Sequence, residues 1–255
     1  QSFVYDWQYS EFRKKHFGSD ASDYPGYQFV AFSQNHDQVG NRLKGDRLSH
    51  LVSFEGLKLI AGIELLAPYI PMLFMGEEFG ADTPFQYFIS HNDHELVKAV
   101  RRGRKREFKA FNWKGTPPDP DDPQTFERCK LNWDFEKDEQ KAALFKLYQR
   151  LIQLRKSHPA LQKPDKATTE AYVIESGVMG LTRGNTGKRV VGLFNFNETA
   201  EQIALPVDGQ FELVLNSNHQ NWRGSSNNST FSDVNKKNAN IQLPGQSFYL
   251  LNEVV

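Results

Sequence analysis

The sequence predicts an α/β segment followed by an all-β domain: the last strands and helices of a (β/α)8 TIM barrel, and then a small antiparallel β-sandwich. Within residues 27–76, two apolar runs that read as buried strands flank a helical stretch. From about residue 168, short β-rich runs alternate with Gly and Asn turns. Strand, helix, strand with short connections is a parallel β-α-β unit, and successive short strands form antiparallel sheets. We expect the barrel part to occupy residues 1–165 and the β-domain residues 166–255.

The expected β-α-β unit begins with YQFVAFS at residues 27–33, a nearly continuous apolar run typical of a strand covered on both faces. Residues 51–67 carry apolar side chains at helical spacing until Pro68, which ends the helix. The second strand, IPMLFMG at residues 70–76, ends in Glu77 and Glu78. Both strands place polar residues at their carboxyl ends, and this edge of an α/β barrel carries the chemistry.

The remaining stretches are read from their composition. A basic helix is expected at residues 95–111, with its charges on a solvated face. Residues 115–126 are rich in Pro and Asp, and we expect them to form a loop without regular structure. Residues 138–156 predict another helix, and the Asn/Ser-rich tract at 216–233 predicts a long surface loop.

The overall composition argues against several classes of partner. The chain has 31 basic and 31 acidic residues, so its formal net charge of zero points to neither nucleic acid nor an anionic membrane. The single cysteine fits a reducing compartment, and the N-terminus has no signal-peptide pattern, so we expect a cytoplasmic protein. The chain starts without Met in the middle of an apparent pattern, which indicates part of a longer or processed protein.

The main candidate site follows the first strand, in FVAFSQNHDQVGNR at residues 29–42. A fixed carboxylate such as Asp37 stabilises the oxocarbenium-like transition state of glycoside hydrolysis, and His36 can bond a sugar hydroxyl. A structural alternative stays open. In that alternative Asn35, Asp37 and Asn41 cap the following turn, and Arg42 neutralises Asp37.

Weaker candidates lie further along the chain. His91, His94 and Glu95 have the spacing of metal ligands, but no further His or Cys accompanies them, so we expect no metal site. Glu77 and Glu78 could form an acid/base pair, although neighbours on a strand point in opposite directions and at most one would face a site.

Several sequence blocks together resemble the α-amylase family of glycoside hydrolases. They are FVAFSQNHDQVGNR, GDR at 45–47, APYIPMLFMGEEFG, TPFQYFISH, VRRGRKREF, LNW at 131–133 and LIQLRKSHPAL. They occur in the family's order and cover essentially the whole chain. Within the family, the resemblance is closest to the enzymes that act on maltooligosyl trehalose.

The resemblance implies a retaining hydrolase that cuts the α-1,4 bond next to the terminal trehalose of this oligosaccharide and releases trehalose. It assigns Asp37 as the third catalytic carboxylate, the transition-state stabiliser. Water is the second substrate, and no cofactor or metal is implied. The implied substrate-binding residues are His36, Gln38, Val39, Gly40, Asn41, Arg42 and Glu77. The aromatic residues Phe79, Phe85, Tyr87 and Phe88 could stack on sugars, although core packing is expected for at least two of them.

The family's other two carboxylates, the nucleophile and the general acid, come from earlier barrel strands. No matching Arg-x-Asp strand precedes Phe29. We therefore expect the rest of the barrel to come from a missing N-terminal portion, and the 255 residues alone to be inactive. A different class remains as the alternative, a non-catalytic carbohydrate-binding or interaction fragment with a sugar site around Trp222.

Overall fold

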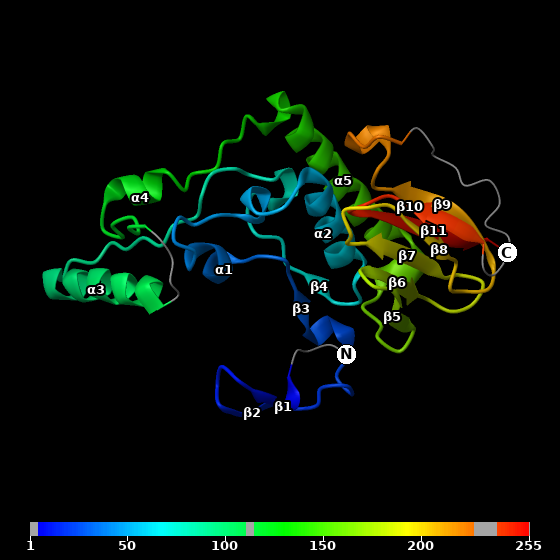
Figure 1. Cartoon of the computed structure of the whole chain (residues 1–255), viewed down its shortest axis with the longest axis horizontal. Helices are drawn as coiled ribbons and strands as arrows, with labels where there is room; N and C mark the ends of the chain where they lie inside the picture. The colour runs from blue at the N-terminus through cyan, green and yellow to red at the C-terminus, as the bar shows by residue number, and fades with distance from the viewer. Residues whose placement is uncertain (1–4, 111–114, 227–238, 255) are drawn as a thin grey trace.

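The computed structural model describes residues 5–110, 115–226 and 239–254, without the side chains of residues 108–110 (Figure 1). The helices are α1 (His36–Gly40), α2 (Phe54–Leu66), α3 (His94–Ala110), α4 (Pro123–Glu127), α5 (Glu139–Ser157) and α6 (Pro159–Gln162). The strands are β1 (Asp6–Ser10), β2 (Lys15–Gly18), β3 (Val30–Ala31), β4 (Ile70–Pro71), β5 (Thr169–Glu175), β6 (Val178–Arg183), β7 (Val190–Asn195), β8 (Glu201–Ala204), β9 (Gln210–Asn216), β10 (Asn240–Leu243) and β11 (Ser247–Val254). A mixed helical segment thus precedes an antiparallel β-domain, which confirms the predicted fold class.

Strands β3 and β4 form the parallel pair that the β-α-β pattern predicts. Val30 pairs with Ile70, and Ala31 pairs with Pro71. The backbone N–H of Ile70 donates to the carbonyl of Phe29 over 2.9 Å, and that of Met72 donates to Ala31 over 2.9 Å. Each strand is only two residues long, so the predicted strand lengths were wrong. One reason is that Pro71 has no N–H to donate to a ladder.

Helix α2 connects the two strands and carries the apolar surface that the sequence predicts. It begins after Ser53, whose hydroxyl accepts from the backbone N–H of Gly56 over 2.9 Å and so caps the first turn. It ends at Leu66, two residues before Pro68. The helix contacts α5 and the strands β7 and β11 of the large sheet.

The β-domain has a five-stranded antiparallel sheet in the order β5-β6-β7-β11-β9, and a two-stranded sheet of β10 and β8. The β-rich runs of the sequence predict the five strands of the large sheet: AYVIES at 171–176, VMGLTR at 178–183, RVVGLFNF at 189–196, FELVLNS at 211–217 and SFYLLN at 247–252. No such run was expected at β8 or β10. Successive residues of the central strands point to opposite faces. In β11, Phe248 and Leu250 face the helices, whereas Tyr249 and Leu251 face the small sheet.

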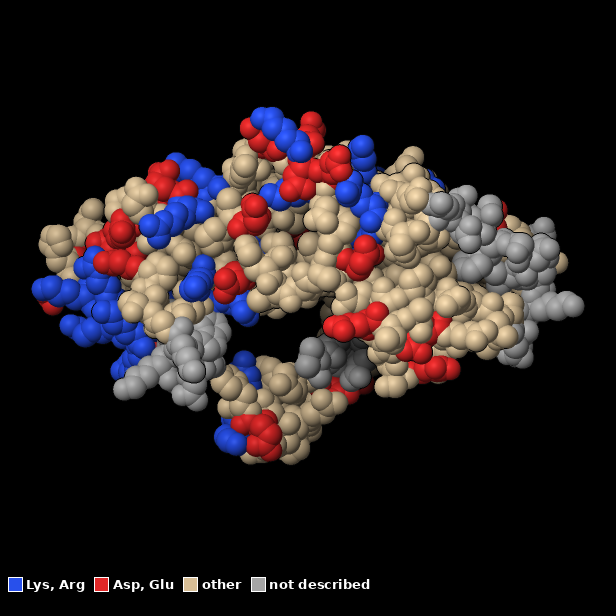
Figure 2. Space-filling model, turned by 45° about the horizontal axis from the view of Figure 1, so that its top comes forward, with Lys and Arg blue, Asp and Glu red and all other residues tan. Residues whose placement is uncertain are grey.

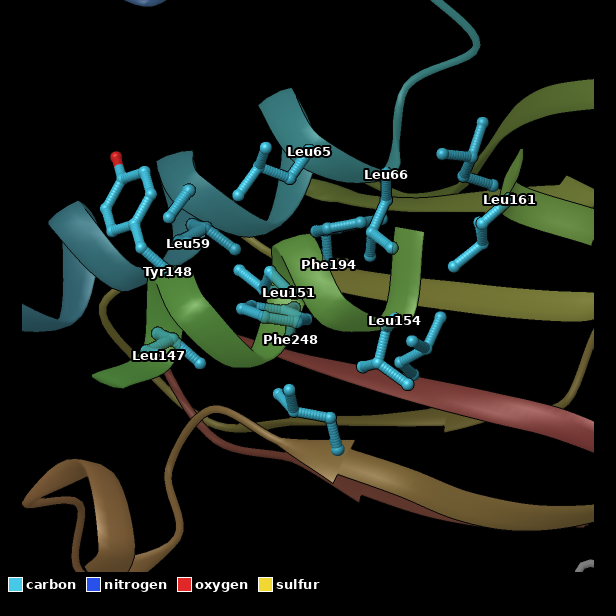
Figure 3. Close-up of a cluster of buried hydrophobic side chains, with 14 of the residues drawn as sticks. Leu59, Leu65, Leu66, Leu147, Tyr148, Leu151, Leu154, Leu161, Phe194 and Phe248 are labelled. Atoms are coloured by element: carbon cyan, nitrogen blue, oxygen red, sulfur yellow. The ribbon is translucent and has the colours of Figure 1, made fainter. Parts of the chain in front are cut away.

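The larger core therefore lies between the β-domain and the helices α2 and α5. Figure 3 shows leucines of both helices converging on Phe194 of β7 and Phe248 of β11. These two rings are fully buried, and their centroids are 5.7 Å apart in a stacked arrangement. Burial of this kind, at about 25 cal/mol per Å² of apolar surface, joins the helical segment to the β-domain.

Buried cations strengthen the same junction. The Lys58 ammonium of α2 donates to the carbonyls of Ser217 over 2.9 Å and Trp222 over 3.0 Å. Arg183 of β6 donates to the carbonyl of Leu66 over 2.9 Å. Arg155 of α5 donates to the carbonyl of Ala67 over 2.8 Å. The two arginine bonds satisfy carbonyls at the C-terminal end of α2, where the helix provides no N–H partners of its own.

The Pro/Asp-rich stretch at 115–126 was expected to lack regular structure, and this was wrong at its end. Helix α4 begins at Pro123, which suits the first helical position because no N–H is needed there. The carboxylate of Asp122 accepts from the backbone N–H of Gln124 over 2.9 Å and caps the helix. The expected surface loop at 216–233 is also partly wrong, because Asn216 and Ser217 are buried. Residues 227–233 lie outside the described part of the chain.

The hairpin of β1 and β2, which the sequence did not predict, stands away from the rest of the molecule (Figures 1 and 2). At the end of the molecule formed by α3, Figure 2 shows a gathering of lysine and arginine side chains. Within the described ranges, no helix combines the length and apolarity needed to cross a membrane.

Candidate active site at the end of β3

The polar cluster after β3 forms the short helix α1. Asn35 precedes it in an extended conformation, and its side-chain oxygen accepts from the backbone N–H of Gln38 over 2.9 Å. This is an N-cap, so the capping role suggested for Asn35 is confirmed. The cap directs the next two side chains, those of His36 and Asp37, away from the interior.

His36 and Asp37 are both exposed. Their side chains are 71% and 74% exposed, and the Nε2 of His36 lies 3.5 Å from the Oδ1 of Asp37. The ion pair that Arg42 forms is with Asp46, over 3.6 Å. The alternative in which Arg42 neutralises Asp37 is therefore wrong. Asp37 is left as a solvent-facing carboxylate beside an imidazole.

The other predicted site residues divide into two groups. Gln38 and Asn41 are exposed on the same short helix, and Arg42 is half-buried beside it. Val39 and Gly40 are buried. The structure thus exposes His36, Asp37, Gln38 and Asn41 and turns the Val39 side chain inward.

Helix α3 contributes a contact that the sequence analysis missed. The guanidinium of Arg104 donates to the carbonyl of Gly40 over 2.8 Å and to the Oδ1 of Asn41 over 3.0 Å. It also lies over the ring of Tyr87, 4.6 Å from the centroid. Its side chain is only 12% exposed, so the expectation that the charges of α3 form a solvated face is wrong at this residue. The only signal was that VRRGRKREF belongs to the blocks carrying the family resemblance.

The aromatic residues after β4 split between core and surface. Phe79 is buried and stacks on Phe135 with ring centroids 4.4 Å apart. Phe85 packs edge-on against Phe74 with centroids 5.3 Å apart. Tyr87 and Phe88 keep 41% and 37% of their surface exposed. Two of the four rings are thus taken up by packing, and Tyr87 and Phe88 remain accessible.

Glu77 is placed inward, away from the exposed side chains of α1. It belongs to a short 3-10 turn between Gly76 and Gly80, both of which have positive φ. Residues with a side chain rarely adopt a positive φ, so the two glycines allow the backbone to turn sharply here. Glu77 is 5% exposed, and its Oε1 accepts from the hydroxyl groups of Ser33 over 3.0 Å and Tyr148 over 3.1 Å.

A second carboxyl, that of Glu64 in α2, lies beside Glu77. Burial and the charge of Glu77 raise the pKa of Glu64 to about 8. Groups of three or more His, Cys, Asp or Glu that could hold a metal are absent from the residues that the structure describes.

Comparison with known proteins shows which proteins the chain is similar to. Residues 172–253 match the family described as "Alpha amylase, C-terminal all-beta domain". The solved structure of a putative alpha amylase from Salmonella typhimurium superposes with a TM-score of 0.77 at 31% identity, covering 98% of this chain and 39% of that one. An alpha-amylase from H. orenii shares the fold, with a TM-score of 0.54 at 18% identity over 88% of this chain and 39% of its own. Residues 172–253 thus belong to this domain family, and the chain as a whole is a homologue of part of an α-amylase-family protein.

Curated relatives narrow this further. The chain is 45% identical over 212 residues to malto-oligosyltrehalose trehalohydrolase of Mycobacterium tuberculosis H37Rv, covering 81% of this chain and 35% of the relative. The Saccharolobus solfataricus protein of the same name is 39% identical over 216 residues, with 85% and 34% covered. The Brevibacterium helvolum protein is 46% identical over 162 residues, with 62% and 28% covered. The chain is thus a homologue of malto-oligosyltrehalose trehalohydrolase, and it spans about a third of the length of these relatives.

Proposed function

We propose that the chain is part of a retaining glycoside hydrolase that cleaves the α-1,4 bond next to the terminal trehalose of maltooligosyl trehalose and releases trehalose. The observation that carries this proposal is the placement of Asp37, a capped, solvent-facing carboxylate at the carboxyl end of a barrel-type strand. The homology to malto-oligosyltrehalose trehalohydrolase supplies the substrate class.

In this proposal Asp37 stabilises the transition state. Positive charge develops on the anomeric carbon and the ring oxygen as the glycosidic bond breaks, and a fixed carboxylate lowers the energy of that state. His36 bonds a neighbouring sugar hydroxyl, and Gln38, Asn41 and Arg42 extend the polar surface. The buried Val39 and Gly40 support this surface from below, and Glu77 acts from the interior.

The nucleophile and the general acid are proposed to come from outside residues 1–255. Retaining hydrolysis needs two carboxyl groups about 5 Å apart across the scissile bond. The face of β3 and β4 supports the view that further strands complete the barrel. The paired residues Val30 and Ile70 are 57% and 41% exposed, and Met75, which follows β4, is 45% exposed. Apolar strand surface of this kind is normally covered in an α/β barrel.

Replacement of Asp37 by Asn in the intact hydrolase tests the assignment. The change removes the negative charge at nearly constant shape. We expect the rate of trehalose release to fall roughly 10³-fold or more, with the free energy of unfolding nearly unchanged. The matched control is Asn35→Ala, which removes the cap and costs about 1 kcal/mol of stability. An Asp37→Asn enzyme with wild-type turnover would overturn the assignment.

The chain by itself is expected to be inactive. Because the proposal places the nucleophile and the acid elsewhere, the purified 255 residues should release no trehalose from maltooligosyl trehalose. Release at the rate of the intact enzyme would show that the chain carries its own complete set of catalytic groups.

A second candidate function is carbohydrate binding by the β-domain. An open cavity of about 290 Å³ lies between α5 and the segment after β9. Its lining includes Arg150, Asn216, His219, Asn221 and Trp222, a mixture of amides and a ring that suits sugars. Calorimetric titration of maltooligosaccharides into the chain tests it. Binding that Asn221→Ala weakens would support this candidate, and no measurable heat would remove it.

A further inference from the structure

Two buried carboxyl groups meet behind the end of β3, one from α2 and one from the turn after β4. The Oε2 of Glu64 accepts from the backbone N–H of Ser33 over 3.1 Å. The Oε1 of Glu77 accepts from the hydroxyl of the same serine over 3.0 Å. The two carboxyls thus hold both polar donors of Ser33, which lies two residues before the Asn35 cap.

The pair has hydrogen-bond donors around it but no cation bound to it. Tyr148 of α5 donates to the Oε1 of Glu77 over 3.1 Å, and the backbone N–H of Phe74 donates to its Oε2 over 3.3 Å. Among the described residues, neither Glu64 nor Glu77 forms an ion pair with Lys, Arg or His. Glu64 and Glu77 are each 5% exposed, so water contributes little to stabilising a negative charge on either carboxyl.

Both carboxyls reach the same serine while they are buried, and the Oε1 of Glu64 has no hydrogen-bond partner in the described part of the chain. Two adjacent buried carboxylates without a cation repel each other, so one of the pair is expected to hold a proton. Besides Tyr148, the charged groups that face the pair are Glu78 on the same turn and Arg47 on the neighbouring loop. Arg47 donates to the carbonyls of Met75 over 2.8 Å and Thr83 over 2.6 Å, so its own hydrogen bonds are directed to the backbone.

We propose that Glu64 and Glu77 are positioning residues that share one proton and thereby fix Ser33, in the loop between β3 and α1 from which the Asn35–Asp37 segment enters the site. For its catalytic consequence the proposal rests on the function assigned to Asp37. Neither glutamate touches the substrate. Their role is to keep the last residue pair of β3 and the start of α1 in one position.

Loss of the shared proton would release Ser33 from at least one of the two glutamates. Two adjacent buried carboxylates repel each other, and one must move toward water, which removes at least one of the bonds to Ser33. The raised pKa of Glu64, about 8, places this event at mildly alkaline pH. The geometry at Asp37 should therefore loosen as the pH rises through this range.

Substitution of Glu64 separates positioning from mere packing. In Glu64→Gln the amide oxygen can accept from Ser33, and the amide nitrogen can donate to Glu77, so the variant imitates the protonated state permanently. Glu64→Leu removes both bonds at similar volume. In the intact hydrolase we expect the turnover of the wild type to fall roughly 10- to 100-fold above about pH 8. A rate loss of this size is typical when a catalytic group, here Asp37, is displaced by about 1 Å. The Gln variant should keep its turnover there, and the Leu variant should be slow at all pH values.

Hydrogen exchange of the intact protein gives a readout that does not depend on activity. The amides of residues 33–38, corrected for intrinsic exchange, should lose protection above about pH 8 in the wild type. They should keep protection in Glu64→Gln, and Ser33→Ala should show partial loss at every pH.

The two readouts fail in different ways. If the intact wild type releases no trehalose, the assigned function is wrong, and the exchange data still decide on the pair. If the wild type is active but Glu64→Gln keeps the alkaline decline, the shared proton is not its cause. If residues 33–38 exchange equally in the wild type and Glu64→Leu, the pair does not position the strand end. Either of the last two results overturns the proposal.

Discussion

Gly62 of α2 lies directly against the ring of Phe248 of β11. A Cβ built on this glycine would come within 2.6 Å of the ring carbon Cε1. Real side-chain carbons do not approach so closely, so the helix and the sheet meet at a point where only a hydrogen atom fits.

Substitution of Gly62 by Ala should therefore destabilise the protein. The extra methyl group would displace a fully buried ring, and overpacking of this kind costs about 1–3 kcal/mol. Alanine favours a helix interior by about 1 kcal/mol relative to glycine, which offsets only part of this cost. A lower urea midpoint, with the slope unchanged, is the expected result.

Gly103 of α3 provides the matched control. It is also in a helix interior, but an added Cβ would meet nothing within 4 Å. Gly103→Ala should thus stabilise the protein by up to about 1 kcal/mol. Equal effects of the two substitutions would show that the contact with Phe248 is not what limits the size of residue 62.

The buried ammonium of Lys58 gives a second prediction. Lys58→Met keeps the length of the side chain but leaves the carbonyls of Ser217 and Trp222 without their donor, and Glu55, 2.8 Å away, without its cation. Unsatisfied buried acceptors cost about 1–3 kcal/mol in free energy of unfolding. Chemical denaturation should show a loss in this range.

An exposed pair with the same spacing is the control for Lys58. Lys98 pairs with Glu95 over 2.9 Å, again three residues apart, with 59% and 77% of the side chains exposed. Exposed pairs contribute little, so Lys98→Met should change the stability by less than about 0.5 kcal/mol. A similar loss for both lysines would mean that the backbone carbonyls contribute nothing at Lys58.

The third prediction concerns acid stability and Glu253 of β11. The Arg189 guanidinium lowers the pKa of this carboxyl, which also accepts from the backbone N–H of Gly187 over 2.6 Å. A lowered folded pKa stabilises the protein above the usual value of 4.5, and that stability is lost as the pH falls through the lowered value. Glu253→Gln should therefore be less stable than the wild type at neutral pH, with the difference shrinking in acid.

The stability contribution of Glu64 should change with pH in the opposite direction to that of Glu253, so each of these two residues serves as the control for the other. Its pKa is raised to about 8, so its contribution is complete below 4.5 and is lost as the pH rises toward 8. Unfolding curves recorded from pH 3 to 9 should show Glu64→Gln gaining on the wild type at high pH and Glu253→Gln approaching it at low pH. The same pH trend in both variants would contradict the assigned causes.

Much of the fold could be predicted from the sequence because its long elements follow one periodicity. Helix α5 and strand β6 lie within a residue or two of their expected ranges. Strands β8 and β10 were missed because each has only four residues, two of them turned outward, so the alternation is too short to recognise. The apolar run that contains β4 continues past the end of the strand. The strand length was therefore overestimated, because hydrophobicity predicts burial but not hydrogen bonding.

The site could be predicted in part for a related reason. Polar residues after an apolar strand indicate a strand end, and the structure exposes His36 and Asp37 there. The contact of Arg104 with Asn41 joins residues 63 positions apart, and no local pattern reports such a distance. Glu77 follows the same strand-end rule, but the turn at Gly76 redirects its side chain into the interior.

The five-stranded sheet is apolar on both faces, and this limits where the polypeptide can be divided. One face is covered by β8 and β10, and in the described part of the chain the face of Phe194 and Phe248 is covered by α2, α5 and Leu161 of α6. A gene segment starting at β5 would encode a sheet whose inner surface, built to contact helices, meets water and favours self-association. The β-domain is therefore not a portable module. A segment exchanged between related proteins should therefore begin before α2, so that the helix and its Glu64 come with the sheet. To keep Glu64 together with its partner, the segment should also include Ser33.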